Sequence, residues 1–149
     1  MNVHLKRRIF VDSDVVISAL LFGTGAASLL LREKTLSCLI SSVSLTEIIA
    51  VSQRLAISKA KLSQLIKENL IQVKLTDSVS ALKKKYEMYV VHAEDAHIVA
   101  GAIAAQSQFL VTYNLKHYRR DSLKADFEIL VMSPGIFLQY LRSQQVRTP

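Results

Sequence analysis

The stretch RIFVDSDVVISALLF, residues 8–22, decides the fold expected of this 149-residue chain. Its apolar start, Ile9 to Val11, predicts a short buried strand that ends at the carboxylate of Asp12. A second apolar run, Val15 to Leu21, predicts a buried helix or an extension of the strand. Gly23 then interrupts the apolar pattern. A buried strand that ends in a carboxylate predicts polar groups at one edge of a sheet.

Outward from this stretch, short apolar runs alternate with helical patterns along the chain. The other expected strands are Ser37–Val43, Ile71–Leu75, Phe109–Thr112 and Phe127–Val131. The expected helices are Ala26–Lys34, one that begins at Ser44 with Glu47 three residues on, one that begins at Ser58, one from Asp77 to about Met88, Glu94–Ser107, and one that begins at Ser133 and Pro134. This alternation predicts an α/β fold, with a parallel sheet of about four or five strands flanked by helices on both faces.

Two of these helices show a clear apolar face. In the helix Glu94–Ser107, side chains that are mostly small recur at helical spacing, which lets the helix pack close to the sheet. They are Ala96, Val99, Ala100, Ile103 and Ala104. In the last helix the expected apolar face is Ile136, Phe137, Tyr140 and Leu141. We expect the chain from Arg142 onward to form a polar tail.

The composition is typical of one globular domain over residues 1–149, with 50% hydrophobic and 21% charged residues. The net charge of +7 attracts a polyanion such as RNA or DNA, but it equally serves solubility.

The lone cysteine, Cys38, excludes an internal disulfide and a thiolate-rich zinc site. Asp12 and Asp14 break the apolar N-terminal region, and the apolar run 98–105 is too short to cross a bilayer. We therefore expect a cytoplasmic protein without a membrane segment.

Three carboxylates stand where the expected strands and helices begin or end. Asp12 follows the first strand, Glu47 lies in the helix after the second, and Asp95 opens the helix of small residues. A parallel sheet brings such ends together, and clustered carboxylates repel one another unless a cation neutralises them or some are protonated. Hard oxygen ligands suit Mg²⁺ or Mn²⁺, which bind phosphate and activate a water for in-line attack. The pattern therefore predicts a divalent-metal site.

Each carboxylate also has a local explanation, and both interpretations stay open. Glu47 completes a capping box with Ser44. Asp95 suits the positive end of a helix dipole, and Asp12 and Asp14 suit the turn after a strand, where carboxylates accept backbone hydrogen bonds. Local capping does not, however, require the three acids to share one edge of a sheet.

The same segments carry a family resemblance that spans nearly the whole chain. Residues 8–22 resemble the opening of PIN-domain proteins, in which a hydrophobic strand ends in Asp, a small residue, Asn and further apolar residues. The remaining segments resemble those of PIN-domain proteins in the same order. Ser44–Ile49 is similar to the segment that supplies the family's second acid, and Glu94–Ala105 to the segment that supplies the third. Phe109–Tyr118 is similar to the fourth-strand motif, and Ser133–Leu138 to the closing strand-to-helix segment. The order and spacing resemble especially the VapC-like toxin components of toxin–antitoxin pairs.

This resemblance implies a single PIN-like domain over residues 1–149 with metal-dependent ribonuclease activity, which hydrolyses RNA phosphodiester bonds. It implies Asp12, Glu47 and Asp95 as the acidic cluster that holds Mg²⁺ or Mn²⁺. Asn114 is implied as a fourth catalytic member, and Asp14 and Thr112 as supporting residues. The implied partners are RNA, an antitoxin protein and a second copy of the chain.

The chain departs from the family pattern at two positions. Asp14 stands where many members have Asn, which adds negative charge near the site. Asn114 and His117 occupy the candidate positions where many members have Asp. An amide holds a water by hydrogen bonding but supplies no charge, so these departures predict a weaker second metal site or weaker activity.

Polar residues after the fourth strand have two interpretations each. Lys116, Arg119 and Arg120 contact a nucleic-acid backbone near the site, or they form a solvated loop. Thr112 hydrogen-bonds to the metal site, or it satisfies backbone groups at the end of the strand. His92 and His97 do not have the spacing of a zinc site.

Two other functions compete with the nuclease. The run Val11 to Val15 also resembles the nucleophile motif of haloacid-dehalogenase-like phosphatases, in which Asp12 attacks phosphorus and Asp14 is the acid/base. That interpretation leaves Glu47 without a role, and the chain is short for the usual core and cap. The second competitor is a catalytically weak or inactive PIN-fold module that binds RNA, for which the missing fourth Asp is the argument.

Overall fold

The computed structural model describes residues 6–146 and contains a five-stranded parallel sheet. The strand order is β3-β2-β1-β4-β5, and each neighbouring pair of strands is parallel. The strands are β1 (Arg7–Val11), β2 (Leu36–Ser41), β3 (Ile71–Val73), β4 (Phe109–Val111) and β5 (Leu130–Met132). The expected α/β architecture with a parallel sheet is therefore confirmed.

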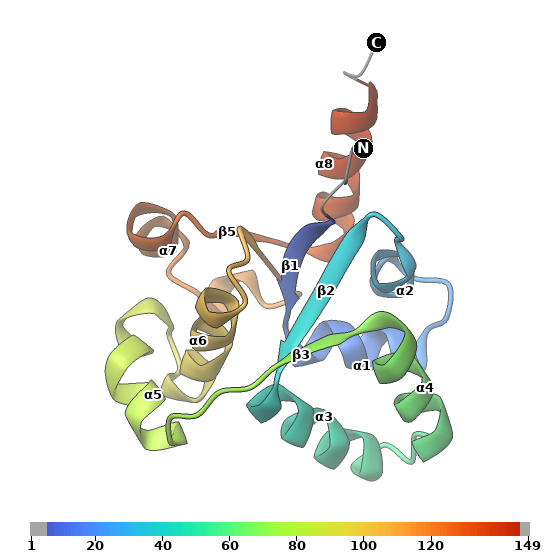
Figure 1. Ribbon diagram of the computed structural model, residues 1–149, viewed down its shortest axis with the longest axis horizontal. Coiled ribbons are helices and arrows are strands. Elements are labelled where there is room, and N and C mark those ends of the chain that lie inside the picture. Colours follow the sequence, from blue (N-terminus) through green and yellow to red (C-terminus); the bar gives the residue numbers. More distant parts are fainter. Residues whose placement is uncertain (1–5, 147–149) are drawn as a thin grey trace, which may run out of the picture.

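In the described part of the chain, eight α-helices connect and follow the strands (Figure 1). They are α1 (Ser13–Leu21), α2 (Ala26–Arg32), α3 (Ser42–Arg54), α4 (Lys59–Asn69), α5 (Val79–Tyr86), α6 (Ala96–Ala104), α7 (Arg120–Phe127) and α8 (Pro134–Val146). Three short 3₁₀ turns, η1 (Glu87–Tyr89), η2 (Ala93–Asp95) and η3 (Leu115–His117), lie between them. Within residues 6–146 no single helix is long and apolar enough to cross a membrane, and α1 and α2 pass that test only as a pair bent by 104°.

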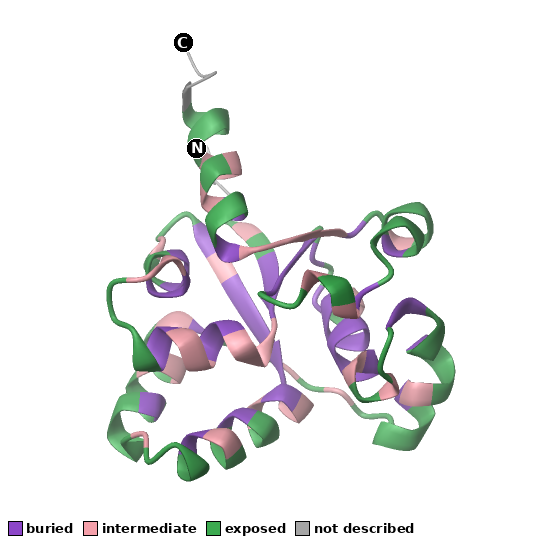
Figure 2. Ribbon diagram, turned by 180° about the vertical axis from the view of Figure 1, so that it is seen from behind, coloured by how far each residue is buried: buried purple, intermediate pink, exposed green. Residues whose placement is uncertain are grey.

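The sheet separates two hydrophobic clusters, because side chains of a strand alternate between its faces. Ile9 and Val11 of β1 belong to the cluster beneath α1 to α4 and α8, whereas Phe10 belongs to the cluster beneath α5 to α7. In Figure 1, α5 to α7 lie on one side of the sheet and α1 to α4 on the other, whereas α8 stands above it. Buried residues follow the strands and the inward faces of the helices (Figure 2). The last three residues of the middle strand are thus covered on both faces, which explains the apolar run from Ile9 to Val11.

A glycine allows α6 to lie directly against β1. A Cβ placed on Gly101 would lie 2.3 Å from the Phe10 ring, so no larger residue fits without displacing the helix or the ring. Ala96, Val99 and Ala100 of the expected apolar face are buried, whereas Ala104 is exposed. Because His97, Ile98 and Ala102 are also buried, most of the helix surface is covered rather than one stripe.

The boundaries of β2 and α3 differ from the expected ones. The strand ends at Ser41 and the helix begins at Ser42, so Val43 is helical. The helix is capped by Ser41, whose hydroxyl accepts from the Ser44 backbone N–H at 3.0 Å. The expected capping box between Ser44 and Glu47 is wrong, because the Ser44 amide is already bound and the Glu47 carboxylate pairs with a residue of another helix.

The C-terminal third also differs from the expectation. Phe127 ends α7, a helix that the sequence pattern did not indicate, and the fifth strand begins only at Leu130. The last helix begins at Pro134 as expected, with the Ser133 hydroxyl accepting from the Ile136 amide at 3.3 Å. Ile136 itself is 52% exposed, so it does not belong to the buried face. The expected polar tail from Arg142 is helical to residue 146, because it continues α8.

Candidate functional site

The topology gathers polar side chains at the carboxyl edge of β1 and β4. These two strands are neighbours, and Val11 pairs with Val111. The residues that follow the pair, Asp12 and Thr112, therefore leave the sheet side by side. The Asp12 backbone N–H donates to the Val111 carbonyl at 2.9 Å, so the ladder continues up to the first carboxylate.

The Asp12 carboxylate is fixed by three donors. Asp12 is the N-cap of α1, and its Oδ1 accepts from the Ser13 backbone N–H at 2.7 Å. Its Oδ2 accepts from the Thr112 hydroxyl at 3.0 Å and from the Tyr118 hydroxyl at 2.7 Å. The donors come from the helix, the end of β4 and the segment after η3, so the carboxylate has one defined orientation.

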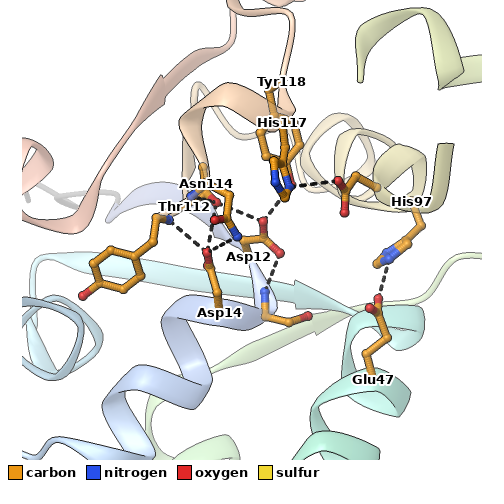
Figure 3. Close-up of polar contacts among 11 residues, drawn as sticks. Asp12, Asp14, Glu47, His97, Thr112, Asn114, His117 and Tyr118 are labelled. Atoms are coloured by element: carbon orange, nitrogen blue, oxygen red, sulfur yellow. Dashed lines mark hydrogen bonds and ion pairs between the residues drawn. The ribbon is translucent and has the colours of Figure 1, made fainter. Parts of the chain in front are cut away.

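Asp14, one residue into α1, points toward the chain that follows β4 (Figure 3). Its Oδ2 accepts from the Asn114 amide at 3.0 Å, the Tyr113 backbone N–H at 3.1 Å and the Thr112 hydroxyl at 3.4 Å. Its Oδ1 is buried, and no donor among residues 6–146 reaches it. Burial and then the negative charge of Asp12 raise the pKa of Asp14 from 3.8 to about 7.

Asp95 reaches the same edge from the other side. It ends η2 and precedes α6, and its Oδ2 lies 3.3 Å from Nδ1 of His117. Burial and then the charge of Asp12 raise the pKa of Asp95. Burial together with the charge of Asp12 thus raises the pKa of two carboxylates from separate segments, Asp14 and Asp95. The structure therefore brings these three aspartates to one edge of the sheet.

A short antiparallel bridge holds the Asp95 segment against the segment after β4. Val90 pairs with Tyr118, the Val91 N–H donates to the His117 carbonyl at 2.8 Å, and the Arg119 N–H donates to the Tyr89 carbonyl at 2.9 Å. These bonds lie just before η2 and just after η3. They place Tyr118 and His117 where their side chains reach carboxylates.

Tyr118 is a site residue that the sequence pattern did not indicate. Its side chain is buried, and its hydroxyl donates to Asp12 across 106 positions of the chain. Burial and the adjacent Asp12 carboxylate raise the pKa of Tyr118 far above its ordinary value, so the phenol stays a donor. The residue before it in sequence, His117, gives no indication that Tyr118 binds Asp12.

Glu47 does not join the aspartates in this conformation. It lies in the second turn of α3, and its Oε1 pairs with Nε2 of His97 on α6 (Figure 3). The His97 side chain is buried, whereas that of Glu47 is 50% exposed. Nδ1 of His97 is buried, and no partner for it is found among the described residues.

The predicted basic residues lie beside the site on the surface. Lys116 belongs to η3, Arg119 is the N-cap of α7 and Arg120 is the first residue of that helix. All three are exposed, and none of them forms an ion pair within the described part of the chain. The expected loop is thus a 3₁₀ turn followed by a helix start.

The oxygen donors at this edge fit a divalent cation by type and by charge. Asp12, Asp14 and Asp95 offer carboxylate oxygens, which hard cations such as Mg²⁺ prefer. The buried Oδ1 of Asp14 lacks a partner, which a cation would supply. However, no three His, Cys, Asp or Glu side chains within residues 6–146 already stand as a ligand group. Binding therefore needs side-chain adjustment, above all by Glu47.

Comparison with known proteins identifies relatives of this arrangement. A family model described as PIN domain matches residues 8–116, which include Asp12, Glu47, Asp95 and Asn114. The solved structure of VapBC2 from Rickettsia felis bound to a DNA fragment from their promoter contains a similar chain, with 16% identity and a TM-score of 0.58 over 85% of this chain and 98% of that one. A chain in the structure of FitAB bound to the IR36 DNA fragment is 18% identical, with a TM-score of 0.52 over 85% of this chain and 94% of that one. No curated protein matches in sequence.

Proposed function

Because this chain belongs to the PIN-domain family, we propose that it is a divalent-metal-dependent ribonuclease, the toxin of a toxin–antitoxin pair. The observation that carries the proposal is the convergence of Asp12 and Asp95 from separate segments of the chain. Burial and then the charge of Asp12 raise the pKa of Asp95, so the two carboxylates share one electrostatic environment. Such a cluster favours a bound cation, because the cation removes the repulsion.

Asp12 and Asp95 are the principal ligands in this proposal. A bound Mg²⁺ or Mn²⁺ supplies charge that neutralises the phosphodiester and lowers the pKa of an attacking water. Thr112 and Tyr118 hold the Asp12 carboxylate in place by donating to its Oδ2. Glu47 acts as a ligand or orients the water after its carboxylate leaves His97, and its exposed side chain has room for that rotation.

The charge distribution supports an RNA substrate. The net charge is +7, although the site itself is acidic. Lys116, Arg119 and Arg120 lie at the border of that acidic edge, where they contact the phosphates on either side of the scissile bond. An RNA strand is thus attracted by the surface as a whole and positioned by the exposed basic residues after β4.

The partner is an antitoxin protein. Two of the similar solved structures are those of VapBC2 and of FitAB, each bound to a DNA fragment. By analogy, this chain pairs with an antitoxin that places a segment against the acidic edge of the sheet, and it forms a homodimer. A cytoplasmic location follows from the proposed RNA substrate.

A PIN-fold module that binds RNA without cleaving it is the second candidate. The observation that favours it is the pairing of Glu47 with His97, which withdraws one acid from the cluster. The amide at position 114 supplies no replacement charge. The phosphatase alternative loses its basis, because the family model covers the run Val11 to Val15 that suggested it.

RNA cleavage assays separate the two candidates. Wild type and Asp95→Asn are incubated with labelled single-stranded RNA in Mn²⁺, in Mg²⁺ and in EDTA. The proposal predicts cleavage by the wild type only with metal, and at least about 100-fold slower cleavage by Asp95→Asn, since a lost ligand removes several kcal/mol of charge stabilisation. RNA binding without cleavage in all three conditions favours the module, and metal-dependent cleavage that survives the substitution contradicts the assigned site.

A further inference from the structure

The fourth position of the acidic cluster is the weak point of the proposed nuclease, because Asn114 carries no charge. We infer that Asp14 supplies the missing carboxylate, and that Asn114 is the donor that positions it. The acid of the fourth position thus comes from α1 instead of from the chain after β4. This inference rests on the proposed function, since it assigns one more ligand to the same site.

Contact between the two side chains is direct. The Asn114 amide donates to Oδ2 of Asp14 at 3.0 Å, although the residues are 100 positions apart. The Tyr113 backbone N–H donates to the same oxygen at 3.1 Å. The carboxylate of Asp14 therefore reaches the chain after β4 and lies against the side chain at position 114, so position 14 can deliver a charge to that place.

The hydrogen bonds leave one oxygen of Asp14 free for a ligand. The Tyr113 backbone N–H and the Asn114 amide both donate to Oδ2, and the Thr112 hydroxyl, which is nearer to Asp12, lies 3.4 Å from the same oxygen. Oδ1 is buried without a donor in the described part of the chain. A buried carboxylate oxygen without a partner is unfavourable, and a divalent cation satisfies it.

Asp14 also lies next to the principal ligand. The Thr112 hydroxyl is 3.0 Å from Oδ2 of Asp12 and 3.4 Å from Oδ2 of Asp14, so one hydroxyl touches both carboxylates. Figure 3 shows the two carboxylates and Asn114 gathered at the end of β1 and β4. A cation held by Asp12 therefore lies within the reach of the Asp14 side chain.

A purely structural role for Asp14 makes different predictions. As an acid in the first turn of α1, Asp14 stabilises the helix through the dipole, and its Oδ2 orders residues 112–114. Asn at this position keeps the size and an acceptor oxygen, but it loses the charge. Asp121 is a matched control, because it is likewise the second residue of a helix, α7, and is exposed.

The test is an exchange of the two side chains, with Mn²⁺ binding measured by calorimetry in the absence of RNA. We expect Asp14→Asn to weaken Mn²⁺ binding about 10-fold or more, while Asp121→Asn binds as the wild type does. The double variant Asp14→Asn/Asn114→Asp restores the acid from the other element, so its affinity should return to within about three-fold of the wild type. The rate of RNA cleavage should likewise fall in Asp14→Asn and recover in the double variant.

A second measurement does not depend on the folding of Asp14→Asn. Asn114→Asp alone places two carboxylates in contact, so it should lower Tm without metal and give a larger Mn²⁺-induced rise in Tm than the wild type. Unchanged Mn²⁺ affinity in Asp14→Asn, or a double variant as weak as the single one, overturns the inference. That result differs from failure of the proposed function, in which the wild type binds no Mn²⁺ or binds it equally well after Asp12→Asn.

Discussion

Replacing Asp14 with Asn should change how the stability of the metal-free protein depends on pH. Burial and the charge of Asp12 raise the pKa of Asp14 from 3.8 to about 7 in the folded state. Between these two pH values the folded chain holds a proton that the unfolded chain has released, so stability falls as pH rises. Below about pH 4 Asp14 is protonated in both states and does not lower the free energy of unfolding. Above about pH 7 it lowers that free energy by the full amount.

The magnitude follows from the size of the pKa change. A rise from 3.8 to about 7 corresponds to about 4 kcal/mol, at about 1.36 kcal/mol for each pH unit. The neutral amide that replaces the carboxylate in Asp14→Asn does not titrate. The free energy of unfolding of Asp14→Asn, relative to the wild type, should therefore rise by up to about 4 kcal/mol between pH 4 and pH 8.

Urea denaturation in EDTA at pH 4, 5, 6, 7 and 8 measures this difference. Subtracting the variant from the wild type removes the contributions of the titrating groups that do not interact with Asp14. Asp121→Asn, which removes an exposed acid from the same helix position, is the control for the loss of one surface charge. Parallel curves for the wild type and Asp14→Asn across this range would refute the assignment of a half-buried, charge-repelled carboxylate.

Three further variants test the packing and the surface. Tyr118→Phe removes the hydroxyl that donates to Asp12, so urea denaturation should show a loss of about 1.5–3 kcal/mol, and an unchanged midpoint would argue against this bond. Gly101→Ala forces a Cβ into the Phe10 ring and should cost about 1–3 kcal/mol in the same assay, whereas a neutral result would mean that α6 is free to shift. Combined Ala substitution of the three basic residues at the site should reduce the salt dependence of RNA binding by a slope of about 2, and an unchanged slope would place the RNA elsewhere. These residues are Lys116, Arg119 and Arg120.

The centre of the site could be predicted because it depends on one strand and its neighbours. The apolar run that ends at Asp12 is buried on both faces of the sheet, so its sequence alone shows both the strand and its end. The small residues of α6 likewise indicate a helix that packs close to the sheet, as Gly101 against Phe10 shows. Strong apolar patterns of this kind locate the carboxyl edge and the acids beside it.

The contacts that orient the acids could not be predicted, because they join positions far apart in the chain. Glu47 has the spacing of a capping residue for Ser44, but His97 of another helix binds it instead. Tyr118 reaches Asp12 only because the bridge between Val90 and Tyr118 holds the segment in place. Sequence spacing gives no information about such tertiary contacts.

Helix α7 was missed for a different reason. It has no side-chain cap at Arg119, and Leu123 is its one buried residue among eight. Tertiary contacts hold it instead, since Phe127 packs on Tyr89 with ring centroids 5.0 Å apart and the Tyr89 hydroxyl donates to Asp126 at 2.7 Å. Phe127 therefore resembles the start of a strand in sequence, although it ends a helix.

Crystals soaked in Mn²⁺ and measured at the manganese absorption edge give the most direct test of a metal-dependent site. The account predicts an anomalous peak at the carboxyl edge of β1 and β4, in contact with carboxylate oxygens of both Asp12 and Asp95. A peak that touches neither aspartate, or no peak at Mn²⁺ concentrations that support RNA cleavage, would contradict it.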